Sequence, residues 1–297
     1  MTVAEDVARG EARRHAIGVA LVIAAGTLWS VAGPLVRAIE HAGVWQVLFY
    51  KSLWMVVTLG AAMIVRYRRR ALGMALAGGR WTAIAGLCLA GSSTFWILSI
   101  TSTTVANTLL VQAATPLVAA MMAWLILGER VDRSTRGAMA VALAGVVVMV
   151  GDGALDGRAF GNVAAIAAVL CFAAFAVALR AGRGADMTAA LCLGGLLAMA
   201  VAWPLAGTLD MDARDHALCF AMGSLETGLG LWLFTLGSRW VPAGELVLLA
   251  MVEVFVGPLI VWWLFGEVPS VGTLAGGALV VAAIVGQAIV ALRRSGR

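Results

Sequence analysis

The fold of this chain is set by a segment that begins with VANTLL at residues 105–110 and ends with AWLILGE at 123–129. The same order recurs in the second half of the chain, as PAGELV at 242–247 and VWWLFGE at 261–267. Upstream of each copy, Gly91 and Phe95 match Gly228 and Trp232 at the same spacing. The first half of the chain therefore resembles the second, and such self-similarity indicates an internal repeat.

The composition is that of a protein embedded in a membrane. Of 297 residues, 62% are apolar and 12% are charged, and the mean hydropathy is +0.96. Soluble domains average about 45–50% apolar and about 25% charged residues. Each crossing of a bilayer needs about 17–25 apolar helical residues. That length predicts an all-α integral membrane protein with ten transmembrane helices, at residues 16–38, 44–65, 81–100, 105–127, 135–151, 161–179, 188–206, 216–237, 243–265 and 271–292.

The basic residues orient these helices. Of 21 basic residues, 17 fall in the segments on the side of the two termini, and only Arg37, Arg158 and Arg214 fall on the opposite side. Because cytoplasmic loops carry the excess of Arg and Lys, both termini are expected in the cytoplasm. Each repeat has five crossings, so the two copies are inverted, with Glu129 facing the cytoplasm and Glu267 the exterior.

These assignments divide the chain into five parts. They are a cytoplasmic segment at 1–15, the first repeat with spans 1–5 at 16–151, an external connection at 152–160, the second repeat with spans 6–10 at 161–292, and a cytoplasmic tail at 293–297.

Several classes of function are excluded or disfavoured. The single lysine, Lys51, follows Tyr50, so the Gly-Lys-Ser/Thr of an ATP-binding loop is absent and no ATP is expected. The net charge of +5 comes from arginines that bracket apolar runs, which favours a membrane over a nucleic acid as partner. Metalloprotease, hydrolase and metal-cluster motifs are also missing, so we expect no enzyme, cofactor or metal.

Inverted repeats are typical of secondary transporters, because exchanging the conformations of two halves converts an inward-open state into an outward-open one. Inverted repeats are less expected in a channel or a scaffold subunit. The sequence also contains no loop that resembles a selectivity filter. Duplication that merely built a membrane scaffold remains the simpler alternative.

The repeats also resemble a known family. The residues that carry the resemblance are Trp29-Ser30, the stretch 99–110, Thr115-Pro116, the Leu-Gly-Glu at 127–129 and the Phe-Gly-Glu at 265–267. They resemble the EamA repeats of the drug/metabolite transporter superfamily, and within it most of all the bacterial YddG-type aromatic amino acid exporters. The resemblance implies ten helices around a central cavity, alternating access, and export of amino acids, aromatic ones among them, and related metabolites across the bacterial inner membrane. A monomer is the expected oligomeric state.

Three ionisable residues lie deep within predicted spans, where each costs about 2.5–3.5 kcal/mol to insert. They are Lys51, Glu226 and Glu253. A zwitterionic amino acid needs a partner for its carboxylate and one for its ammonium group, which Lys51 and a glutamate would supply. Alternatively, Lys51 pairs with one glutamate and holds two helices together.

Other residues complete the candidate site. Trp54, Trp96 and Trp232 are deep enough to line a cavity for aromatic rings, although packing against lipid is equally allowed. Thr94 and Asn107 add hydrogen-bonding groups, for which bonding between helices is the alternative. Pro34, Pro116 and Pro258 are candidate hinges, with ordinary kinks as the alternative.

The expected function is thus export of amino acids by a secondary transporter. Within transporters, the alternative cargo is a lipophilic cation or another small metabolite of the drug/metabolite class, because two membrane glutamates suit a cation. Outside them, the alternative is an integral-membrane enzyme, for which no motif is found.

Overall fold

The computed structural model describes residues 3–68, 79–128, 133–155, 158–181, 188–237, 240, 249 and 252–295, and its regular elements are helices. In chain order they are α1 (Val3–Trp29), α2 (Ala32–Arg37), α3 (Val44–Tyr67), α5 (Gly79–Ser102), α6 (Val105–Gln112), α7 (Thr115–Leu127), α8 (Arg133–Leu155), α9 (Ala159–Ala181), α10 (Thr188–Leu205), α11 (Ala213–Phe220), the π-helix η2 (Ala221–Leu229), α12 (Gly230–Gly237), α14 (Val252–Phe265) and α15 (Val271–Ser295).

The apolar helices match the predicted crossings. Within the described ranges, seven helical stretches are long and apolar enough to cross a membrane, and three shorter apolar helices accompany them, at Thr135–Gly151, Val252–Phe265 and Val271–Gln287. Two predicted spans are interrupted, one between α1 and α2 and one between α6 and α7. Most of residues 243–251, the start of the ninth predicted span, lies outside the described residues. The prediction of an all-helical, ten-span membrane protein is confirmed.

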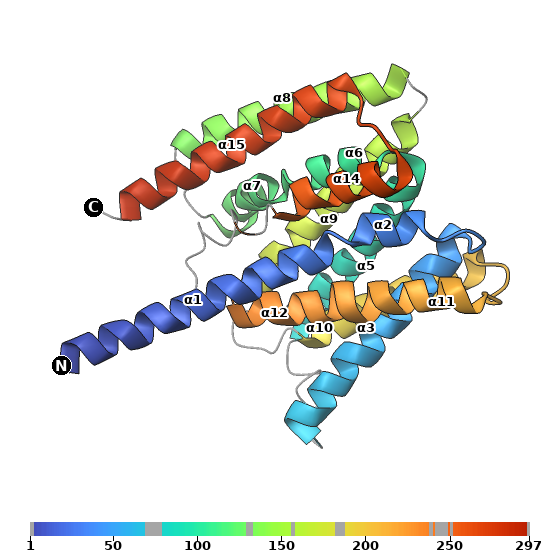
Figure 1. Cartoon of the computed structure of the whole chain (residues 1–297), viewed down its shortest axis with the longest axis horizontal. Helices are drawn as coiled ribbons and strands as arrows, with labels where there is room; N and C mark the ends of the chain where they lie inside the picture. Colours follow the sequence, from blue (N-terminus) through green and yellow to red (C-terminus); the bar gives the residue numbers. More distant parts are fainter. Residues whose placement is uncertain are drawn as a thin grey trace.

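Helix packing follows the two-fold relation that an inverted repeat requires. The two repeats exchange α1 with α9, α3 with α10, and α5 with the span made of η2 and α12. The contact of α5 with α9 is accordingly matched by that of α12 with α1. The contact of α10 with α5 is matched by that of η2 with α3. Helix α7 contacts α9 as α14 contacts α1, while α8 pairs with α15 and α3 with α10. Figure 1 shows α8 and α15 side by side along one edge, and both termini at one end of the molecule, as an even number of crossings requires. We call this the terminus end, and the opposite one the far end.

The α8–α15 pair crosses at two glycines. A Cβ atom added to Gly145 would lie 2.5 Å from the carbonyl oxygen of Gly276, and one added to Gly276 would meet the carbonyl oxygen of Gly145. The helices therefore approach backbone to backbone, as small residues allow in membrane proteins. Gly276 thus serves packing between the two repeats.

Two prolines coincide with the interruptions. Pro34 has no N–H to give to the carbonyl of Ser30, and the chain breaks between α1 and α2 at that point. Pro116 likewise has no N–H for the carbonyl of Gln112, which accepts a hydrogen bond from Thr115 Oγ1 at 2.6 Å instead. Helix α14, in contrast, continues without interruption through Pro258.

A partly buried ion pair ties the far ends of four spans together. Arg37, at the end of α2, places Nε 2.7 Å from Glu267 Oε2, beyond the end of α14. Its Nη1 and Nη2 donate to the carbonyls of Ile100 and Thr103 at 2.9 and 2.8 Å. Glu267 Oε1 accepts the backbone N–H of Val105, at the start of α6. We call this arrangement the far-end latch.

A second carboxylate at this end holds the connection between α2 and α3. Asp215, which is fully buried in α11, accepts the backbone N–H groups of Glu40, His41 and Ala42 at 3.3, 2.9 and 2.8 Å. The two repeats are thereby joined at the far end by backbone groups as well as by charge.

The glycine crossing predicts a large difference between two substitutions on α15. Gly276→Val should lower the thermal unfolding midpoint in detergent by several degrees, because overpacking a tight contact costs about 1–3 kcal/mol. Gly286→Val is the matched control, since a Cβ atom there meets nothing within 4 Å. Equal unfolding midpoints for the two variants would contradict the close approach.

The far-end latch predicts a similar contrast for charge. Glu267→Gln should reduce stability by about 1–3 kcal/mol, because hydrogen bonds to partly buried charged groups are lost. Arg214→Gln should have almost no effect, since the Arg214–Glu40 pair is exposed to solvent and such pairs contribute little. Both variants are compared by thermal unfolding at low and high salt, and an equal loss for the two would refute the distinction.

Candidate functional site

Lys51 and Trp96 meet at the same depth from the far end. Helix α3 starts at that end and α5 finishes there, so at about 1.5 Å per residue both side chains lie about 10 Å inside. Lys51 Nζ lies 4.3 Å from the centroid of the Trp96 ring, a cation–π contact. Lys51 is 9% exposed and Trp96 is 8% exposed, so the contact is shielded from solvent.

Glu226 projects from the π-helix η2, nearer the middle of the molecule. Single turns of π-helix occur frequently at functional sites, where they change the direction of side chains. Glu226 is buried, and its Oε2 accepts a hydrogen bond from Thr227 Oγ1 at 2.5 Å. Gly223 brings η2 against the backbone carbonyl of Lys51, which places the two charged residues on neighbouring helices.

Glu253 lies in the first turn of α14 and completes the set of charges. Lys51 interacts electrostatically with both Glu226 and Glu253, and the two carboxylates interact with each other. In the described part of the chain, no carboxylate oxygen comes within 4.0 Å of Lys51 Nζ. One cation and two carboxyl groups thus lie within electrostatic range of one another, and in the described residues Lys51 forms no ion pair within 4.0 Å.

The remaining predicted residues have separate surroundings. Trp54 Nε1 donates to His216 Nε2 at 3.3 Å, and the Trp54 ring packs edge-on against Phe220 at 4.9 Å. Thr94 Oγ1 donates to the carbonyl of Ala90 in its own helix at 2.8 Å. Trp232 is 49% exposed.

Asn107 belongs to a buried amide pair that adjoins the far-end latch, because Thr103 contacts both Arg37 and Asn162. Its Nδ2 donates to Asn162 Oδ1 at 2.5 Å, and the two residues are 2% and 0% exposed. Thr103 Oγ1 donates to the same Asn162 oxygen at 3.4 Å. The pair joins α6 to α9, and therefore the first repeat to the second.

Several polar contacts between helices cannot be predicted from the sequence. Asn162 and His216 stand alone near the ends of predicted spans, so their partners Asn107 and Trp54 become evident only in three dimensions. Arg37 was assigned correctly to the side opposite the termini in the helix count, but nothing in its neighbours indicated Glu267. A search for polar residues at equal depth in different spans would have found the Asn107–Asn162 pair.

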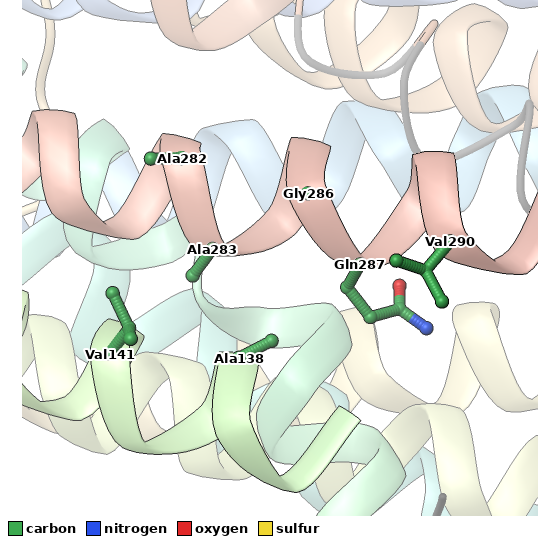
Figure 2. A pocket seen from close by; sticks show the side chains of 7 residues that line it. All are labelled: Ala138, Val141, Ala282, Ala283, Gly286, Gln287 and Val290. Atoms are coloured by element: carbon green, nitrogen blue, oxygen red, sulfur yellow. The ribbon is translucent and has the colours of Figure 1, made fainter. Parts of the chain in front are cut away.

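An apolar groove of about 370 Å³ lies elsewhere, between α8 and α15. Figure 2 shows its lining, in which Gln287 is the polar side chain among small apolar ones. Gln287 Nε2 donates to Thr135 Oγ1 at 3.4 Å. This groove contains no charged side chain, so Lys51, Trp96, Glu226 and Glu253 remain the candidate site.

These observations define the class of protein. A duplicated bundle of apolar helices, interrupted at prolines and holding three ionisable residues at membrane depth, is the architecture of a multi-pass membrane transporter.

Comparison with known proteins relates the first half of the chain to one family. Residues 16–151 match the model of the EamA-like transporter family. A solved structure, described only as "Crystal structure of protein", is similar over 96% of this chain and 99% of its own, with a TM-score of 0.65 and 20% identity, which is a likeness of fold. A search of the curated proteins found no match. The first repeat, residues 16–151, is therefore similar to the EamA-like transporter family, and the whole chain shares the fold of the solved structure.

Proposed function

We propose that this transporter exports amino acids, aromatic ones and other neutral ones, from the bacterial cytoplasm through the inner membrane by alternating access. The observation that supports the proposal most is the separation of charges in the site. Lys51 contacts an aromatic ring instead of a carboxylate, while Glu226 and Glu253 lie within its electrostatic range. A zwitterion offers a carboxylate to the lysine and an ammonium group to a glutamate.

The surroundings of these charges strengthen such binding. Charges attract more strongly at the low effective dielectric of a buried site than in water. Because Lys51 and Glu226 are both buried, each would gain more from a substrate charge than an exposed residue would. This favours a small molecule of mixed charge over one without charge.

The aromatic side chains at the same level support cargo with a ring. Trp54 lies one turn from Lys51 on α3, and its ring already makes an edge-on contact with Phe220. Offset and edge-on contacts between rings add about 0.5–1.5 kcal/mol each. A substrate ring that joined this cluster would gain a contact of that kind.

The interruptions at Pro34 and Pro116 support the proposed movement. Each divides a span into two helices that can change their mutual angle, and the α6–α7 break lies near the middle of its span. In the proposed cycle these breaks act as hinges while the far-end latch opens and closes, and both termini remain in the cytoplasm. Pro258, within the continuous helix α14, is a third hinge candidate.

Counterflow in proteoliposomes tests the proposal. Liposomes loaded with unlabelled amino acids should take up a labelled member of the same panel, with phenylalanine among the substrates. Lys51→Ala and Glu226→Gln should each reduce the initial rate at least tenfold, because each removes one charge partner. Arg214→Gln is the control, because it also removes a charge but lies at the exposed surface.

Two results would overturn this function. One is the absence of counterflow for every amino acid by the folded wild-type protein. The other is a loss of rate in the Lys51 and Glu226 variants that only matches a loss of folded protein, which would assign these residues a structural role.

A lipophilic cation is the second candidate cargo, favoured by two carboxyl groups against one lysine. The two cargoes differ in their dependence on Lys51. Transport of a cation should survive Lys51→Ala and fail in Glu226→Gln, whereas transport of an amino acid should fail in both. The same liposomes, with and without an imposed pH gradient, test for proton exchange, and uptake indifferent to the gradient would exclude a coupled proton.

A further inference from the structure

We infer that Trp96 is a positioning residue, whose ring holds the Lys51 ammonium group apart from Glu226 and Glu253 so that a substrate carboxylate binds it. The inference deepens the proposed function and rests on it where substrate is concerned. The contact between the two side chains does not depend on that function.

The first support is the geometry of the contact. The ammonium nitrogen lies 4.3 Å from the ring centroid, within the distance of about 6 Å at which cation–π attraction is significant. Tryptophan is the best of the aromatic side chains for this contact, and removal of water strengthens it. Both residues are buried, so the ring replaces part of the hydration that the ammonium group loses.

The second support is what the lysine does not contact. A buried ammonium group attracts nearby carboxylates more strongly than an exposed one does, because the effective dielectric is low. In the described residues, its nitrogen has no carboxylate oxygen within 4.0 Å. The Trp96 ring therefore competes with the carboxylates for the ammonium group.

The third support is a matching device on the other side of the site. Thr227 Oγ1 donates a hydrogen bond to Glu226 Oε2 at 2.5 Å. Each of these two opposite charges thus has a neutral partner of its own, Trp96 for the lysine and Thr227 for the glutamate. Without Trp96, the lysine would pair with a glutamate, and the substrate would have to break that pair before binding.

The contact with Lys51 also affects whether the Trp96 ring can stack on a substrate. One face of Trp96 is covered by Lys51, so that face does not stack on a substrate ring. Trp96 acts on the carboxylate of the substrate through Lys51, and selection for an aromatic side chain falls to other residues.

The single lysine of the chain makes a direct test possible. Protein produced with ¹³C-labelled lysine and a lysine-free tag gives one lysine Cε–Hε signal in nanodiscs. The ring current of Trp96 should move this signal upfield from its position in an unstructured peptide. The shift should be smaller in Trp96→Phe and absent in Trp96→Leu, and should persist in Trp124→Leu, whose exposed tryptophan lies on α7. An unshifted wild-type signal, or one unchanged by Trp96→Leu, would overturn the inference.

Addition of substrate tests the second part. Leucine has no ring current of its own, so saturating leucine should move the Lys51 signal by drawing the ammonium group to its carboxylate. No movement, with leucine shown to bind by counterflow, would overturn the assignment of Lys51 to the carboxylate. If no amino acid is transported, the proposed function fails, while the upfield shift still decides whether Trp96 holds Lys51.

Comparing phenylalanine with phenethylamine distinguishes a positioning role of Trp96 from a general effect of its substitution on folding. Trp96→Leu should raise the half-saturation concentration for phenylalanine about tenfold or more, the scale of one desolvated cation–π contact. It should leave competition by phenethylamine, which lacks the carboxylate, nearly unchanged. The double variant Lys51→Ala/Trp96→Leu should be no weaker than Lys51→Ala alone. Equal weakening for both ligands, or additive losses in the double variant, would show a structural role.

Discussion

The cost of an ionised side chain in hydrocarbon governs the arrangement of this molecule. Arginine is gathered largely at the span ends on the side of the termini, and at the far end the Arg37 guanidinium is satisfied by Glu267 and two carbonyl groups. The same cost makes each charge at membrane depth informative. Lys51 and Glu226 are kept there with neutral partners close by, an aromatic ring and a hydroxyl group. The apolar bundle therefore tolerates these buried charges because each has a neutral partner beside it.

The duplication supplies the scaffold, and departures from it supply the site. Gly86 and Gly223 hold equivalent positions, and each lets its helix approach a neighbour closely, at Leu193 and at the Lys51 carbonyl. Three residues further along, the first repeat has Leu89, which packs against Gly194, and the second repeat has Glu226. The same helix packing therefore carries an apolar residue in one half and a charge in the other.

Much of the fold could be predicted because it depends on patterns along the chain. Span lengths, the distribution of arginine and the two Gly-Glu motifs together predict ten helices in two inverted units. The candidate lysine and glutamates follow from the same cost of charge. Contacts between spans could not be predicted. The sequence places both Trp96 and Trp232 well inside their spans. It does not show that Trp96 contacts Lys51 and that Trp232 is half exposed. The π-helix around Glu226 was not predictable either because, although it contains Gly223-Ser224 and Gly228, glycines also occur in regular α-helices such as α15.

The division of charge between the repeats has a consequence for the proposed transport cycle. Lys51 and Trp96 belong to α3 and α5 of the first repeat, whereas Glu226 and Glu253 belong to η2 and α14 of the second. In the proposed cycle, a zwitterion between them would be held by one repeat at its carboxylate and by the other at its ammonium group. Because alternating access moves one part of such a protein against the other, the distance between the two partners changes with the state. A direct Lys51–Glu226 pair would link the halves without cargo, and the Trp96 contact leaves that link to the substrate.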